Sequence, residues 1–137
     1  KARFFVLAHD ERQFDGKDSL TFDDLRGLPF IGLNSRGPLG QALSDYLEAA
    51  DVHPEVVTWT GTYHVARALV AAGTGITIAD EITARSPLGA DVVMLPLEPP
   101  LTFDISLMRR AEAPLSLGTR RFTTHLGNVV RDMVAQG

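Results

Sequence analysis

The fold of this chain is constrained most by short apolar runs that alternate with stretches of helical periodicity. The apolar runs are typical of strands covered on both faces, and each helical stretch carries an apolar stripe. Such an alternation predicts a mainly parallel sheet with helices on its faces, which is an α/β fold. Strands are expected at residues 4–8, 29–33, 55–60, 75–79 and 92–95, and the longer helices at 39–50, 63–72 and 118–134.

Shorter elements complete the pattern and give a mixed sheet of about five or six strands. A short helix is predicted over 21–25, with Thr21 as its cap and Asp24 in the capping-box position, and another over 80–85. Residues 102–107 alternate strictly between polar and apolar side chains, which predicts a strand with one apolar face. The last helix is expected to bury the stripe formed by Phe122, Leu126, Val129, Val130 and Met133.

Length and composition exclude several classes of protein. The 137 residues fit one domain or half of a two-lobed one, and 45% hydrophobic with 22% charged residues is a globular balance. A net charge of −4 has the wrong sign for a chain that grips nucleic acid by itself. The absence of cysteine excludes disulfides and thiolate metal sites. No apolar run is long enough to span a membrane, and the run at 4–8 is too short for a secretion signal.

Two strand-to-helix turns, at 34–38 and 60–63, are the candidate binding sites. Each presents backbone N–H groups at a helix N-terminus, which attract a carboxylate or another small anion. Ser35, Arg36, Thr60 and Thr62 are the candidate contacts, and Arg36 could bind an anion through two hydrogen bonds. Trp59 and His64 are lesser candidates because they lie beside these turns.

Plainer interpretations of the same residues stay open. Hydroxyl and amide side chains at these turns commonly cap a helix without touching a ligand. Trp59 is either a core residue or the wall of a cleft, and the packing role of large aromatics favours the core. The turn at 79–81 is set aside because Asp80 and Glu81 would repel an anion.

Enzymatic and metal sites find little support. No serine lies in a nucleophile-elbow sequence, and none of the four histidines is spaced for metal binding with another ligand residue. The glycines of 72–76 (AGTGI) end a helix and open a strand, which is the reverse of the order that a dinucleotide-binding turn requires. We therefore expect no catalytic residues, metal or cofactor.

The order of several segments resembles a known family over residues 2–134. The segments are LTFDDLRGLPFIGL, ALVAAGTGITIADE, VVMLPLEPPLTFDISLMRR, AEAPLS and TRRFTTHLGNVVRDM. They are similar to the C-terminal part of the effector-binding domain of LysR-type transcriptional regulators. The family more often has Leu-Pro where this chain has Ala79-Asp80.

The resemblance implies a Rossmann-like mixed sheet with helices on both faces, as in type 2 periplasmic binding proteins. In that family two α/β lobes joined by two crossover strands hold a small effector in the cleft between them. Residues 20–97 would be the second lobe, 2–8 and 102–108 the crossover strands, and 118–134 a final helix that packs on the first lobe. The rest of the first lobe and the winged helix-turn-helix DNA-binding domain are absent from residues 1–137.

The implied function is sensing by a cytoplasmic bacterial regulator. The parent protein would bind DNA through its N-terminal domain and self-associate as a homodimer or tetramer, without contact with a membrane. A small anionic effector would bind in the cleft between the lobes of the intact regulator, and half of that pocket is absent from this chain. A solute-binding protein of a transport system is the alternative function, and an enzyme of the same fold is a third. A helix-turn-helix upstream would indicate the regulator, whereas a secretion signal would indicate transport.

Overall fold

The fold was analysed in a computed structural model that describes residues 1–34, 37–86, 91–108, 110 and 114–135. Two compact units make up the chain: Arg3–Phe103 forms one, and Lys1–Ala2 with Asp104–Gly137 forms the other. The larger unit contains the sheet, and the smaller one contains the last helix. Ser35 and Arg36, two of the predicted contact residues, lie outside the described residues.

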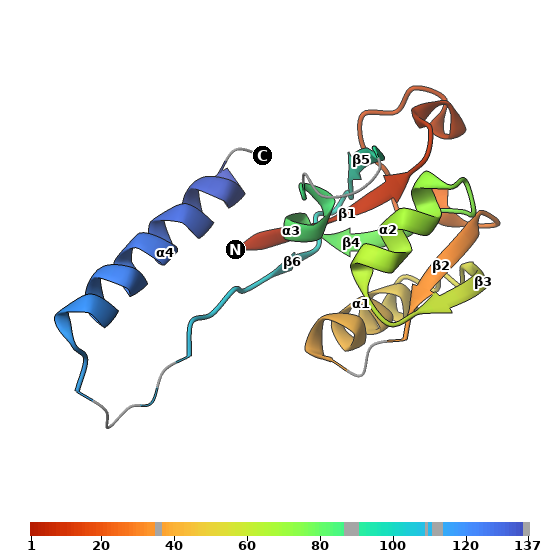
Figure 1. The fold of residues 1–137 in the computed structure, drawn as a ribbon. Coiled ribbons are helices and arrows are strands. Elements are labelled where there is room, and N and C mark those ends of the chain that lie inside the picture. The colour runs from red at the N-terminus through yellow and green to blue at the C-terminus, as the bar shows by residue number, and fades with distance from the viewer. Residues whose placement is uncertain (35–36, 87–90, 109, 111–113, 136–137) are drawn as a thin grey trace. The chain divides into compact units, whose positions relative to one another are not determined.

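The strands form a four-stranded sheet and a two-stranded sheet (Figure 1). β1 runs antiparallel to both β4 and β5 and also pairs with the short β6, while β2 and β3 are parallel. A parallel bridge between Phe30 and Ile76 connects β2 to the segment before β4. The strands are β1 (Ala2–Ala8), β2 (Pro29–Leu33), β3 (Glu55–Thr60), β4 (Thr77–Asp80), β5 (Val93–Pro96) and β6 (Thr102–Phe103).

Helices follow the predicted ranges closely. The α-helices are α1 (Pro38–Ala49), α2 (Tyr63–Ala71), α3 (Glu81–Ala84) and α4 (Leu117–Ala135), and the 3-10 helices are η1 (Glu11–Phe14) and η2 (Asp23–Leu25). The polar stretch that contains η1 shows no periodicity, so its sequence gives no helical signal. Phe14 nevertheless anchors η1, because its side chain is buried in the core.

The expectation of a mainly parallel sheet is only partly met, and the connections explain the difference. A parallel neighbour requires a crossover, and α1 supplies one between β2 and β3. Only two 3-10 helices separate β1 from β2, and β1 pairs instead with strands that lie far along the chain. The predicted mixed α/β class is confirmed. β6 covers only the first two residues of the predicted strand at 102–107.

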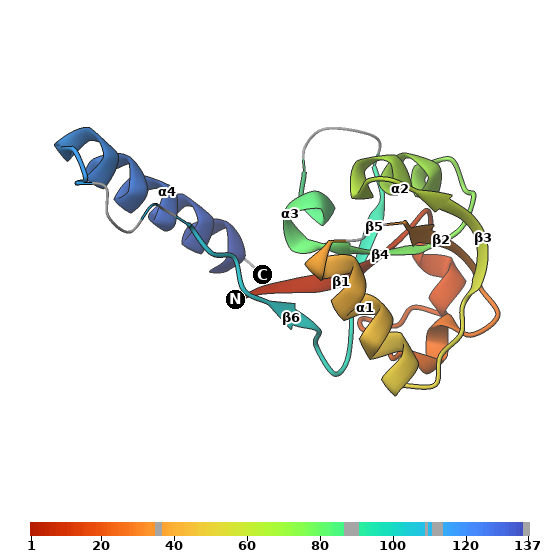
Figure 2. The ribbon, with the colours of Figure 1, turned by 90° about the horizontal axis from the view of Figure 1, so that it is seen from below.

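Alternate side chains of β1 enter two separate cores. Phe4 and Val6 of β1 pack with Leu43 of α1, whereas Phe5 and Leu7 pack with Val70 of α2. α1 and α2 accordingly lie on opposite sides of the strands (Figure 2). This two-sided burial explains why the strand runs are apolar without interruption.

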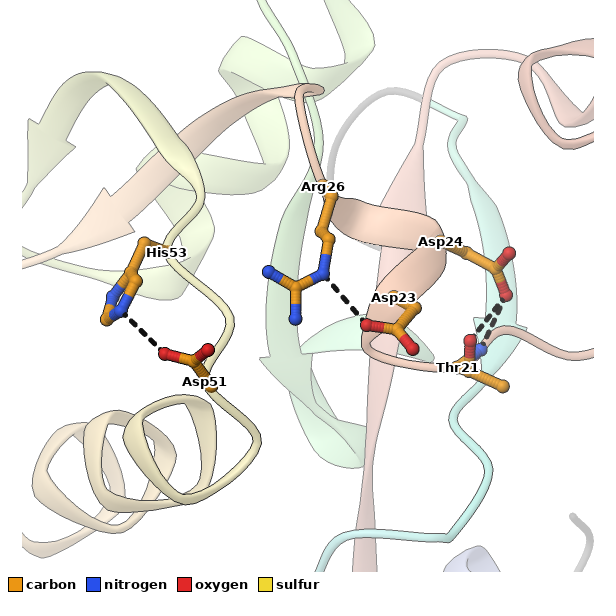
Figure 3. A network of polar contacts seen from close by, with 6 residues as sticks. All are labelled: Thr21, Asp23, Asp24, Arg26, Asp51 and His53. Atoms are coloured by element: carbon orange, nitrogen blue, oxygen red, sulfur yellow. Dashed lines mark hydrogen bonds and ion pairs between the residues drawn. The ribbon is translucent and has the colours of Figure 1, made fainter.

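Only half of the predicted capping box is present in the η2 segment, which is a 3-10 helix whose N-cap is Phe22 rather than Thr21 and has no side-chain cap (Figure 3). The backbone N–H and the hydroxyl of Thr21 both donate to Asp24 Oδ2, at 2.8 and 2.9 Å. A hydrogen bond from Lys17, followed by the backbone N–H of Thr21, lowers the pKa of Asp24 to about 2. Figure 3 also shows the Asp23–Arg26 pair and the contact between His53 and Asp51, which joins the end of α1 to the start of β3.

The glycine-rich turn at 72–76 has the structural role that its order in the sequence predicts. Gly73 has a φ of 78°, and the N–H groups of Gly73 and Thr74 close the end of α2 on the carbonyls of Val70 and Leu69. Gly75 packs against β2 so tightly that an added Cβ would lie 2.3 Å from the carbonyl oxygen of Pro29.

In the smaller unit, the stripe of α4 that was predicted to be buried remains partly open. Phe122 is 63% exposed and Val129 is 43% exposed. The elements described in this unit are an extended segment and one helix, and together they leave an apolar groove beside Ile105, Leu107, Leu126 and Val130. Periodicity identified the helix correctly, but it carries no information about which element covers the stripe.

The close approach of Gly75 to β2 yields a stability prediction. Gly75→Ala should lower the free energy of unfolding by about 1–3 kcal/mol, because backbone atoms rather than a flexible side chain oppose the new methyl group. Gly127→Ala is the matched control, since nothing lies within 4 Å of its added Cβ on the helix, and it should be neutral or stabilising. Urea unfolding measures both, and equal stability of Gly75→Ala and the unmodified protein would contradict the packing.

Candidate functional site

A pocket of about 360 Å³ opens where β2 ends and three helices begin. Ligand sites of open α/β sheets characteristically lie at this edge, where helix N-termini converge. The N–H of Asn34 donates to the carbonyl of Thr60 at 2.8 Å, which holds the two predicted turns side by side. The lining residues are Leu33, Gly37, Pro38, Leu39, Gly61, Thr62, Tyr63, His64 and Thr83.

Two helix N-termini border this pocket with contrasting caps. α1 begins after Gly37, which has no side chain that could cap the helix, and Pro38 occupies its first position. α2 begins after Thr62, whose hydroxyl accepts a hydrogen bond from the N–H of Val65 at 3.3 Å. Both termini present the positive end of a helix dipole to the pocket, so this part of the site favours an anion.

A third wall of the pocket comes from α3, in the turn that the sequence argument set aside. Asp80 caps α3, and its carboxylate accepts hydrogen bonds from the N–H of Thr83 at 3.0 Å and the hydroxyl of Thr83 at 2.7 Å. Thr83 itself lines the pocket. The sequence signal for Thr83 was its spacing of three residues from an acidic cap, which places its N–H within reach of that cap.

Glu81 belongs to a different environment from Asp80, although the two residues are adjacent. Its fully buried carboxylate accepts hydrogen bonds from the N–H of Arg3 at 3.0 Å and from Nε of Arg85 at 3.1 Å, and Arg3 also forms an ion pair with it. Both guanidinium groups lie over the ring of Phe5. Two cations therefore compensate Glu81, so the two acids of this turn do not act together on the pocket.

Tyr63 combines a packing role with an unsatisfied polar group. Its ring lines the pocket and contacts both cores, while its hydroxyl is buried and has no hydrogen-bond partner among the described residues. Burial, assisted by the negative charge of Asp80, raises the pKa of Tyr63 to about 12. Sequence reasoning missed Tyr63, because an aromatic residue in a first helical turn is normally a core anchor.

Only some of the predicted contact residues line the pocket. Thr62 and His64 line the pocket, whereas Thr60 is buried and its hydroxyl donates to the carbonyl of Thr62 at 3.2 Å. Thr60 thus shapes the turn between β3 and α2. Ser35 and Arg36 fall outside the described residues, so their roles stay predictions.

Trp59 is not a core residue, contrary to the interpretation favoured from the sequence. Its side chain is 63% exposed and lies over Gly32, where an added Cβ would be 2.6 Å from the indole ring. Trp59 lines a separate groove between α1 and β3, next to Leu43 and Leu47. The absence of a side chain at Gly32 leaves room for the ring on the sheet surface.

The described part of the chain offers no group of three His, Cys, Asp or Glu residues that could hold a metal ion. Within the same residues, no helix has both the length and the apolar character that crossing a membrane requires.

Comparison with known proteins places these features in a family. Residues 1–131 match the model of the LysR substrate binding domain. The HTH-type transcriptional regulator DgcR of Pseudoalteromonas sp is 32% identical over 111 residues, which are 81% of this chain and 38% of DgcR.

Two solved structures share the fold. The crystal structure of HinK, a LysR family transcriptional regulator from Pseudomonas aeruginosa, has a TM-score of 0.71 at 21% identity, over 90% of this chain and 43% of HinK. The BenM effector binding domain with its effector benzoate has a TM-score of 0.57 at 21% identity, over 70% of this chain and 45% of that domain. The chain thus spans less than half the length of each of these three relatives.

The cap of α2 gives a prediction that tests the local structure of the pocket. Thr62→Ala should lower the free energy of unfolding by about 1 kcal/mol, because the N–H of Val65 loses its acceptor. Thr62→Ser keeps the hydroxyl and should retain nearly all of the stability. Chemical denaturation of the two variants measures the difference, and equal losses for Ala and Ser would show that the hydroxyl does not cap the helix.

Proposed function

The chain belongs to the LysR substrate-binding domain family, and on that premise we propose that it is the ligand-sensing region of a LysR-type transcriptional regulator. In this proposal, the pocket between α1, α2 and α3 receives a small anionic effector. The role of the chain is binding, and no catalytic step is assigned to it. The observation that carries the proposal is the convergence of the α1 and α2 N-termini on one pocket.

Several features of the pocket support a small anion as the effector. Its volume of about 360 Å³ lies near the lower end of the range for small-molecule sites. Gly61 lines the pocket next to the start of α2 and has nothing within 4 Å of an added Cβ, and the lining also includes Thr62 with its hydroxyl. The benzoate complex of BenM provides a carboxylate precedent on the same fold.

In the proposed regulator, the effector is enclosed by this chain on one side and by the other lobe on the opposite side. A winged helix-turn-helix elsewhere in the parent protein binds DNA in the cytoplasm, and effector binding changes that activity. The name of DgcR, an HTH-type transcriptional regulator, supports a parent protein with separate regions for DNA binding and effector binding. The acidic balance of residues 1–137 agrees with it, since the chain has no charge excess suited to phosphates.

We also propose that the parent protein self-associates as a homodimer or tetramer. β3 pairs only with β2 among the described strands, so its other edge presents unpaired backbone groups. Val57 and Trp59 are exposed on this strand at 46% and 63%, and Tyr46 of the neighbouring α1 is exposed at 42%. Exposed apolar residues beside an open strand edge favour contact with another protein surface.

The effector site predicts that Arg36→Ala weakens binding about 10- to 100-fold because it removes a contact to the anion. Thr60→Ala should weaken binding indirectly, because it removes the hydrogen bond to Thr62 that shapes the turn. Arg26→Ala is a matched control, since its partner Asp23 lies in η2 rather than at the pocket. Calorimetry on the full-length protein with a panel of small carboxylates, including benzoate, succinate and amino acids, measures the effect. Stability is followed in parallel by melting temperature.

The two interpretations of these turns give opposite patterns. Loss of a ligand contact lowers affinity with little change in melting temperature, whereas loss of a cap lowers the melting temperature and leaves affinity nearly intact. A verified effector whose affinity is unchanged by both substitutions would contradict the anion site.

The proposed assembly predicts that Val57→Lys raises the dissociation constant of the dimer at least 10-fold, because a charge on an open strand edge opposes pairing. Ile82→Lys, at another apolar position of similar exposure (40%), should leave association unchanged. Sedimentation velocity of the full-length protein over a concentration series measures both. Equal weakening by the two substitutions, or none by either, would place the interface elsewhere.

A further inference from the structure

Asp80 is a buried carboxylate that lacks a cationic partner in the described part of the chain. Its residue is 8% exposed, and its hydrogen bonds come from the N–H and the hydroxyl of Thr83. The adjacent Glu81 is also buried, but Arg3 and Arg85 compensate its charge. A buried carboxylate with only neutral donors retains the capacity to accept hydrogen bonds from a cation.

This carboxylate does not line the proposed effector pocket itself but contacts a residue that does. Oδ2 of Asp80 is 2.7 Å from the hydroxyl of Thr83, and Thr83 lines the pocket. The ring of Tyr63 lines the same pocket, and the charge of Asp80 contributes to the raised pKa of Tyr63. Two residues of the pocket lining are thus neighbours of Asp80, and the contact through Thr83 lies on the α3 side.

The pocket therefore has two electrostatic ends. The N-termini of α1 and α2 attract negative charge at one side, and Asp80 attracts positive charge at the α3 side. A ligand with a carboxylate alone is repelled by Asp80, whereas a ligand that carries both charges satisfies both ends. A charged hydrogen bond from an ammonium group to a carboxylate is among the stronger polar contacts in proteins.

We propose that the effector is an amino acid or a closely related aminocarboxylate, and that Asp80 is the residue that selects its ammonium group. In this arrangement the ligand carboxylate binds at the N-termini of α1 and α2, and the ammonium group binds toward Asp80 and Thr83. Tyr63 offers a donor hydroxyl nearby that no protein group uses among the described residues. The inference rests on the proposed function, because it assigns a ligand class to the same pocket.

The test compares amino acids with acids that lack only the amino group. The probes are both enantiomers of alanine, aspartate, glutamate and phenylalanine, with propionate, succinate, glutarate and 3-phenylpropionate as their counterparts. Calorimetry on the full-length protein should show at least one amino acid that binds 10-fold or more tightly than its counterpart. This comparison uses the unmodified protein, so it does not depend on whether any variant folds.

Two variants test whether Asp80 causes the preference for amino acids over their counterparts. Asp80→Asn keeps an oxygen that can cap α3 but removes the charge, and it should reduce the preference for the amino acid about 10- to 100-fold. Glu81→Gln removes the neighbouring buried charge, which faces Arg3 and Arg85, and it should leave the preference unchanged. An Asp80→Asn protein that retains the full preference would overturn the role of Asp80.

The outcomes separate this inference from the proposed function. If no amino acid of the panel binds more tightly than its counterpart, the ligand class is wrong. Binding of the simple acids in that case would leave the anion site intact. If neither set binds while the protein remains folded, both the ligand class and the proposed anion site fail.

Discussion

Burial of β1 between two cores is the constraint on which the rest of the structure depends. Its side chains alternate between the core beneath α1 and the core beneath α2, and its backbone pairs with β4, β5 and β6. Because β2 and β3 are parallel, the helices that follow them, α1 and α2, begin at one common edge. The bridge between Phe30 and Ile76 brings the end of β4, and therefore α3, to the same edge.

Local hydrogen bonds then determine what this edge can bind. The bond from Asn34 to Thr60 joins the first two turns, Thr62 caps α2, and Asp80 orients Thr83. The two acids of the third turn have different partners, since Glu81 faces two arginines while Asp80 accepts hydrogen bonds from Thr83 of the pocket lining. Charge compensation at one of two adjacent carboxylates leaves the other available for recognition.

Much of the fold could be predicted from the sequence because its periodicities are strong. The bounds of β2 and β3 agree with the predicted ranges, and the hydrogen bond from Thr21 to Asp24 and the turn at Gly73 follow from local chemistry that depends on few residues. Whether strands pair in parallel or antiparallel could not be predicted, since an apolar run has the same pattern in both kinds of pair. The 63% exposure of Phe122 could not be predicted either, because helical periodicity does not show whether another element packs on the apolar stripe.

The candidate site was predicted only in part for the same reason. The turns at 34–38 and 60–63 were identified from helix starts, which are local features. Thr83 and Tyr63 were missed because their importance arises from the convergence of three helices. Trp59 was misplaced because the glycine that accommodates its ring lies on the neighbouring strand, at position 32.

The central claim is that ligand binding occurs where these three helices begin, and amide hydrogen exchange tests it most directly. Exchange of the full-length protein is measured with and without the small carboxylate that binds most tightly in calorimetry. The account predicts slower exchange in the first turns of α1 and α2 and at Thr83, with little change at the groove beside Trp59. Protection confined to that groove, or spread without preference for the helix starts, would contradict it.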